Sequence, residues 1–165
     1  MELLGTFEAV AEIAIALTGF TGVVVALGRR DLIDRSPSER FFLRALVYWS
    51  LGTLFLSFLP AGLSGLAPAT AWRIAHSTFL VFHTAVFVWF FRHTRQLAIP
   101  ASPFGRVAVI LGFGVILAEA SVAFGFVLRA APYLYLLALV WFLFLGATMF
   151  FVLRFPQLPD ETAAQ

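Results

Sequence analysis

Five long apolar stretches, each nearly free of charge, dominate this sequence of 165 residues. A helix of roughly 20 apolar residues crosses a hydrocarbon core about 30 Å thick. Within lipid, only helices and closed barrels satisfy every backbone polar group, and stretches of this length are typical of helices. We therefore predict an all-α integral membrane protein, a bundle of five transmembrane helices spanning about residues 6–27, 41–63, 71–91, 104–128 and 132–153.

The composition excludes an ordinary soluble domain. The chain is 61% apolar and 12% charged, whereas soluble domains carry about 25% charged residues. A soluble fold of this size buries only part of its chain, so much of this apolar surface would remain in water. We expect the lipid bilayer to surround most of the chain, and the net charge of only +2 gives no reason to expect a nucleic-acid partner.

Missing residue types exclude several kinds of chemistry. The sequence has no cysteine, which excludes disulfides, thiol catalysis and thiolate metal sites. It also has no lysine, which excludes a Schiff base and a phosphate-binding loop of the lysine type. No nucleophile lies next to a base in an evident pattern, and no Glu-x-x-His motif occurs. We therefore expect neither a cofactor nor a metal nor catalytic residues, and an enzyme is the less favoured class.

The distribution of arginines predicts the orientation. Nine arginines lie in or beside the segments around residues 28–44 and 92–106 and after residue 153, and only Arg73 and Arg129 lie on the opposite side. Positive loops stay in the cytoplasm, so the N-terminus is expected outside and the C-terminus, with a short tail at residues 156–165, inside. The first stretch begins with Met1 and Glu2 where a signal peptide would be basic, so we expect it to remain as a span. The composition favours a bacterial inner (plasma) membrane.

Local signals predict where helices begin. The run Ser36-Pro37-Ser38-Glu39 is typical of a capping box with proline at the first helical position. Pro103 and Pro132 are expected to open the fourth and fifth helices in the same way.

Aromatic residues are expected at one membrane surface. Trp72, Tyr133 and Tyr135 fall near the predicted outer surface, where aromatic belts form.

Five ionisable residues fall inside the predicted spans: Glu8, Glu12, His76, His83 and Glu119. Counted along their helices, all five lie between the outer surface and the midplane. Charged groups in a span cost about 2.5–3.5 kcal/mol and usually face a bundle interior or water. They are therefore candidates for an ion or proton pathway. In the simpler interpretation Glu8 lies at the headgroup level and the histidines only bridge helices.

Glycine spacing suggests which helices meet. Gly19 follows Glu12 by seven residues, and Gly112 precedes Glu119 by seven. If the first and fourth helices pack side by side in opposite directions, the two carboxyls share one level and the two glycines another. Small residues let backbones approach closely, and Gly22 extends the stripe. This hypothesis places Glu12 and Glu119 together, where they would share a proton.

Two functional classes follow from these residues. The favoured one is an oligomeric ion- or proton-conducting channel or small transporter, with Glu12 and Glu119 as central carboxyls and the two histidines as a relay. Glu8 would lie at its mouth, and a monovalent cation or proton would be the species moved. The alternative is a non-transporting accessory or scaffold subunit whose buried polar residues specify helix packing. A membrane-embedded enzyme or lipid-binding sensor is a weaker third option. In each case self-association into a homo-oligomer is expected to shield the polar face of the first helix.

Overall fold

The structure, a computed structural model, describes residues 2–27, 36–97 and 103–154, with side chains described at 5–20, 22, 36–97 and 105–150. The predicted tail at residues 156–165 therefore lies outside the described residues. Helices make up nearly all of the described chain, and no strand occurs in it, which confirms the all-α prediction. The elements are α1 (Glu2–Leu27), α2 (Pro37–Gly62), α3 (Pro68–Gln96), α4 (Pro103–Ala123), the short 3-10 turn η1 (Leu128–Ala130) and α5 (Ala131–Arg154).

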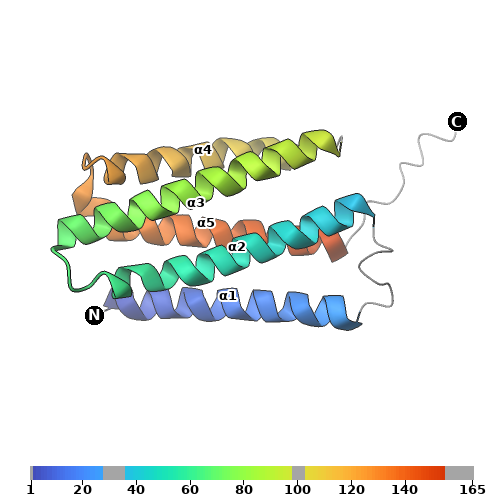
Figure 1. Cartoon of the computed structure of the whole chain (residues 1–165), viewed down its shortest axis with the longest axis horizontal. Coiled ribbons are helices and arrows are strands. Elements are labelled where there is room, and N and C mark those ends of the chain that lie inside the picture. The colour runs from blue at the N-terminus through green and yellow to red at the C-terminus, as the bar shows by residue number, and fades with distance from the viewer. Residues whose placement is uncertain (1, 28–35, 98–102, 155–165) are drawn as a thin grey trace, which may run out of the picture.

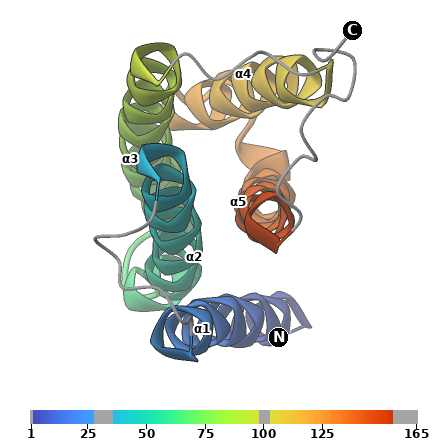
Figure 2. The same cartoon turned by 90° about the vertical axis from the view of Figure 1, so that its right-hand side faces the viewer.

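The five long helices run up and down side by side, each antiparallel to the one before it (Figure 1). Viewed along the bundle, α1 and α4 lie at opposite sides, and α2 and α3 form the wall between them (Figure 2). Helix α5 lies in the middle and contacts each of the other four long helices. The core is therefore organised around the inward face of α5.

Four helical segments are long and apolar enough to cross a membrane: α2, α3, residues 105–123 of α4, and residues 128–150 of η1 and α5. The chain therefore has the helices of a membrane protein. Helix α1 has 26 residues, but its side chains are described only in part, so a fifth span stays a prediction.

Helix ends follow the local chemistry of the sequence. Ser36 accepts a hydrogen bond from the Glu39 backbone N–H at 3.2 Å, and the Glu39 carboxylate accepts from the Ser36 N–H at 2.9 Å. This is the predicted capping box. Helix α4 begins at Pro103 as expected.

The end of α4 differs from the prediction. The helix ends at Ala123, whereas the hydropathy pattern extended it to about residue 128. Gly125 adopts a φ of +87°, a left-handed conformation that glycine takes without strain. The N–H of Gly125 donates to the Val122 carbonyl and that of Phe126 to the Ser121 carbonyl, each at 2.8 Å. This pair of bonds is a Schellman motif, which ends the helix one turn early.

Glycines do mediate close helix packing, but of the three expected ones only Gly112 does so, and against α3 rather than α1. Gly52 on α2 lies under the ring of Phe82 on α3, and Gly146 on α5 lies against Ser50 on α2. Gly112 on α4 is buried against Phe87 on α3. The proposed packing of α1 against α4 through Gly19 and Gly112 is therefore wrong.

The reason lies in the arrangement of the helices. Helix α1 packs mainly on α2 and α4 mainly on α3, so the two lie on opposite sides of the bundle (Figure 2). Gly19 and Gly22 are exposed, and no described atom lies within 4 Å of the Cβ that either would carry as alanine. Neither contributes to packing within one copy of the chain.

We expect Gly52→Ala to lower the free energy of unfolding by about 1–3 kcal/mol, because the new methyl group overlaps the Phe82 ring. The matched control is Gly114→Ala on the exposed side of α4, where nothing lies within 4 Å. That variant should be unchanged or slightly more stable, since alanine favours helix. Unfolding followed by circular dichroism in detergent measures both, and equal effects would contradict the packing.

Candidate functional site

A histidine and a glutamate meet inside the bundle near one end. His76 belongs to the inward face of α3, where the buried positions 76, 79, 83 and 86 recur every three or four residues. Glu119 lies one turn before the end of α4, on the same buried face as Gly112. The Nδ1 atom of His76 lies 2.7 Å from Oε2 of Glu119, and both side chains are fully buried.

The second ring nitrogen of His76 contacts the beginning of α5. Its Nε2 lies 3.0 Å from the carbonyl oxygen of Ala131. One imidazole thus joins α3, α4 and α5 through two hydrogen bonds. The ring thus links three consecutive long helices at this end of the bundle.

These contacts determine how many protons the pair holds. A carbonyl oxygen only accepts, so Nε2 of His76 must carry a hydrogen. The short contact between Nδ1 and Oε2 requires a second proton, bound either to His76 or to Glu119. In both arrangements the pair has two protons and no net charge. The site is therefore a neutral, buried pair in which one proton can transfer between Nδ1 of His76 and Oε2 of Glu119 over a short distance.

One atom of the pair lacks a partner. Oε1 of Glu119 is buried, and no described group lies within hydrogen-bonding distance of it. A buried acceptor left unpaired costs about 1–3 kcal/mol. This oxygen is therefore available to accept a hydrogen bond or a proton.

Aromatic rings enclose His76. The Tyr135 ring meets the imidazole edge to face at 5.2 Å between centroids, and the Trp72 ring lies at 6.2 Å. Tyr135 is fully buried and donates its hydroxyl hydrogen to the Leu56 carbonyl at 2.8 Å. The expectation that Tyr135 belongs to an aromatic belt is therefore wrong, whereas Tyr133 is exposed.

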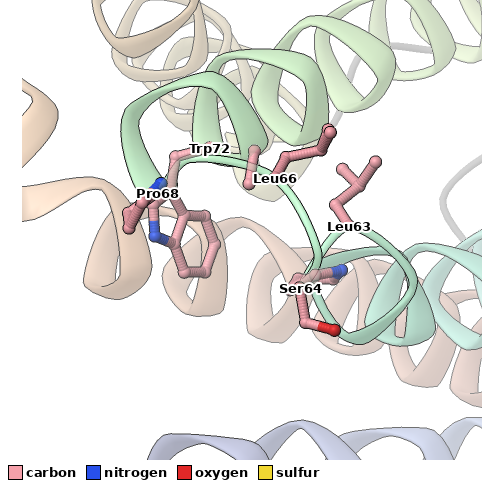
Figure 3. Close-up of a pocket in the computed structure, with 7 residues that line it drawn as sticks. Leu63, Ser64, Leu66, Pro68 and Trp72 are labelled. Atoms are coloured by element: carbon pink, nitrogen blue, oxygen red, sulfur yellow. The ribbon is translucent and has the colours of Figure 1, made fainter.

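A small pocket lies next to this aromatic wall. It has a volume of about 170 Å³ and lies at the turn between α2 and α3 (Figure 3). Trp72, with Ser64 and Pro68, forms part of its lining. The Trp72 ring thus borders both the pocket and His76.

His83 lies two turns further along α3 in a second enclosed position. The ring is fully buried, and neither nitrogen has a hydrogen-bond partner among the described residues. Phe142 and Trp49 present their rings nearly perpendicular to it, at centroid distances of 4.9 and 6.5 Å. Seven residues correspond to about 10.5 Å of helix, so His76 and His83 do not touch.

Glu8 and Glu12 lie away from this cluster. Both are exposed on the outward face of α1, which does not border α4. The expected pairing of Glu12 with Glu119 is therefore wrong within one copy of the chain, and the partner of Glu119 is His76. Of the five predicted pathway residues, the structure brings together two, places His83 nearby on the same face, and leaves the two α1 carboxyls outside.

Sequence reasoning missed two neighbours of the pair. Tyr135 could have been found from α5, where positions 135, 138, 142, 145 and 149 are all buried and recur with a helical period. Arg73 had been counted only for orientation, yet its Nε donates to the Ala123 carbonyl at 3.2 Å, at the end of α4. No sequence signal indicated that contact, because it depends on the early end of α4.

The described residues contain no group of three or more metal-binding side chains. His76 and Glu119 supply two ligand types, but both nitrogens of His76 already take part in hydrogen bonds, to Glu119 and to the Ala131 carbonyl. The chemistry that this arrangement supports is the holding and transfer of a proton.

No family model matches the chain, and neither curated proteins nor solved structures show significant similarity to it. The function must therefore be argued from these side chains alone.

We expect His76→Leu to lower the free energy of unfolding by about 3–5 kcal/mol, since it leaves Glu119 buried without its partner. Replacing both residues by leucine should be less harmful than His76→Leu alone, because the Glu119 carboxyl is then no longer buried without its partner. The matched control is His93→Leu, whose ring is half-buried and bonds only the Trp89 carbonyl of its own helix. It should cost about 1 kcal/mol. Denaturant titration in micelles measures all three, and a double variant that is no more stable than His76→Leu would contradict the coupling.

Proposed function

We propose that this chain is a small bacterial inner-membrane protein that moves protons through a channel-like or transporter-like path, with His76 and Glu119 as its proton-holding pair. The observation that carries the proposal is the neutral, fully buried pair with Oε1 of Glu119 left unpartnered. Intramembrane ionisable residues of this kind mark proton and ion pathways in many proteins. Histidine also titrates near physiological pH, which suits proton transfer.

The geometry supports a stepwise transfer. A proton that binds Oε1 makes Glu119 a neutral carboxylic acid, and the shared proton then rests on Nδ1 of His76. The pair then holds three protons and one positive charge, on the imidazolium. To release the hydrogen on Nε2, the ring must break its bond to the Ala131 carbonyl. The described arrangement is therefore a closed state, in which the first residue of α5 blocks departure of the proton.

A proton path through the bundle needs a route to the pair and a further proton acceptor beyond it. The pocket at the turn between α2 and α3 is separated from His76 by Trp72, so movement of that ring would admit water. Beyond the pair, His83 offers two unpartnered nitrogens about 10.5 Å along α3. A proton crosses that distance only through water, so opening must hydrate the interval between the two histidines.

The proposed topology keeps five spans, with the N-terminus outside and the C-terminus in the cytoplasm. Arg40 and Arg44 lie in the first turns of α2, Arg92 and Arg95 at the end of α3, and Arg106 in the first turn of α4. These helix ends lie together at one end of the bundle (Figure 1). The positive-inside rule assigns that end to the cytoplasm.

The proposed homo-oligomer forms through α1. Its outward face carries small residues around one carboxyl, with Gly5, Ala9, Glu12, Ala16 and Gly19 all exposed. Their spacing of four and three residues matches the seam of a left-handed helix pair. Lipid facing Glu12 would cost about 2.5–3.5 kcal/mol, which favours covering it with the same helix of a second copy. Glu8 lies one turn away and would reach the outer mouth.

We expect Ala16→Phe to reduce self-association, because the ring prevents close approach of two α1 helices. The control is Gly114→Phe on the exposed side of α4, which should leave assembly unchanged. Chemical crosslinking in proteoliposomes measures the oligomer in both variants. An unchanged crosslinked fraction in Ala16→Phe would contradict an α1 interface.

The second candidate function is a scaffold or accessory subunit. The observation in its favour is that His76 bonds both α4 and α5, as expected of a polar group that fixes helix register. In that case the pair would stay dry and its loss would affect assembly rather than flux.

The deciding experiment is proton flux in proteoliposomes under a pH gradient, from about pH 5 to about pH 8, where histidine titrates. We expect Glu119→Gln to lower flux by at least about tenfold, since the amide cannot pass a proton. The matched control is Glu39→Gln, which changes only the cap of α2. Proton flux that survives Glu119→Gln would contradict proton transfer through this pair. A wild type without flux, together with a Glu119→Gln variant that dissociates in detergent, would also contradict it and would favour the scaffold.

A further inference from the structure

A second hollow, lined mostly by polar residues of α3, shares no lining residue with the pocket at the turn between α2 and α3. It has a volume of about 380 Å³ and lies at the end of the bundle where α4 stops. Its lining residues are Thr70, Arg73, Ile74, Ser77, Thr78 and Ala123. The hollow contains one positive charge and no acidic side chain, so its charge favours an anion.

The guanidinium of Arg73 is held in place for binding. Its Nε donates to the Ala123 carbonyl at 3.2 Å, which fixes the plane of the group against the end of α4. No other described group accepts from it, so the two terminal nitrogens stay free to donate. Guanidinium groups bind phosphate through two parallel hydrogen bonds, and pre-orientation lowers the entropy that binding costs.

Two hydroxyl groups flank this guanidinium. Thr70 and Ser77 lie three residues before and four residues after Arg73, on one face of α3. Neither hydroxyl has a hydrogen-bond partner among the described residues, whereas Thr78 donates to the Ile74 carbonyl at 2.9 Å. The hollow therefore presents four unused donors, two from Arg73 and one from each of the two hydroxyls.

The same face of α3 turns apolar beyond the hollow. Ile74, Val81 and Val88 follow one another at seven-residue intervals, and their side chains are 40%, 70% and 47% exposed. Arg73 lies five residues after the start of α3, about 8 Å along the helix. This surface therefore has a charged group at one end of the bundle and an apolar stripe that runs toward the middle. A phospholipid has the matching arrangement, with a charged headgroup followed by apolar acyl chains.

We propose that this hollow binds the phosphodiester of an anionic phospholipid, with Arg73, Thr70 and Ser77 as its donors and the stripe from Ile74 to Val88 along its acyl chain. A free phosphate would use the same donors but gain nothing from the stripe. The proposal depends on the membrane location of the bundle and is independent of proton transfer. Because Arg73 also holds Ala123, one turn after Glu119, the bound lipid lies beside the segment that positions the buried pair.

The test is thermal unfolding of the full chain in detergent, titrated with short-chain phosphatidylglycerol. A ligand that binds only the folded state raises the midpoint, and the titration yields an apparent affinity. We expect Arg73→Gln to weaken that affinity by about tenfold, as for loss of a charge-assisted pair. The control is Arg129→Gln, an exposed arginine in η1 that does not line the hollow and should have no effect.

A second variant keeps the test decisive if Arg73→Gln does not fold. Thr70→Ala with Ser77→Ala leaves the bond between Arg73 and Ala123 intact and should weaken binding by about threefold to tenfold. Equal weakening by Arg129→Gln, or no change in the double variant, would overturn the site. If inorganic phosphate raises the unfolding midpoint as much as phosphatidylglycerol does, the ligand is not a lipid. If short-chain phosphatidylcholine raises the midpoint equally, the site does not select an anionic lipid.

Discussion

The arrangement of the bundle depends on one imidazole that has no access to water. His76 bonds Glu119 on α4 and the Ala131 carbonyl at the start of α5, and all of this is buried. Inside lipid a broken polar contact finds no replacement, so the three helices must meet with these atoms in place. A shift of α3, α4 or α5 therefore changes one of the two hydrogen bonds of His76.

The rest of the packing keeps that contact dry. Helix α5 lies against every other long helix, and Tyr135 on it closes one side of the imidazole. Gly52 and Gly146 let bulky neighbours approach closely, which brings α3 and α5 onto α2. The result is a closed bundle, in which the proposed proton transfer would require movement of Trp72 at the pocket and of Ala131 away from Nε2.

The helices themselves were predictable, because hydropathy and capping are local. The capping box at Ser36 and the start of α4 at Pro103 follow from a few adjacent residues. The neighbours of Glu119 were not predictable, since equal depth in antiparallel helices does not determine which helices touch. Lateral contacts depend on side-chain shape, as where Gly112 meets Phe87 instead of Gly19. Both His76 and Glu119 could be found as candidates, but their direct bond could not.

The protonation of His76 is the central claim, and ¹⁵N solid-state NMR of the reconstituted protein tests it most directly. Because Nε2 of His76 faces a carbonyl oxygen, it must carry a hydrogen whether the shared proton is bound to His76 or to Glu119. We therefore predict a protonated Nε2 from about pH 5 to about pH 8, the range in which a free histidine titrates, and an Nδ1 signal that changes in Glu119→Gln. A deprotonated Nε2, or an Nδ1 signal indifferent to Glu119, would contradict the account.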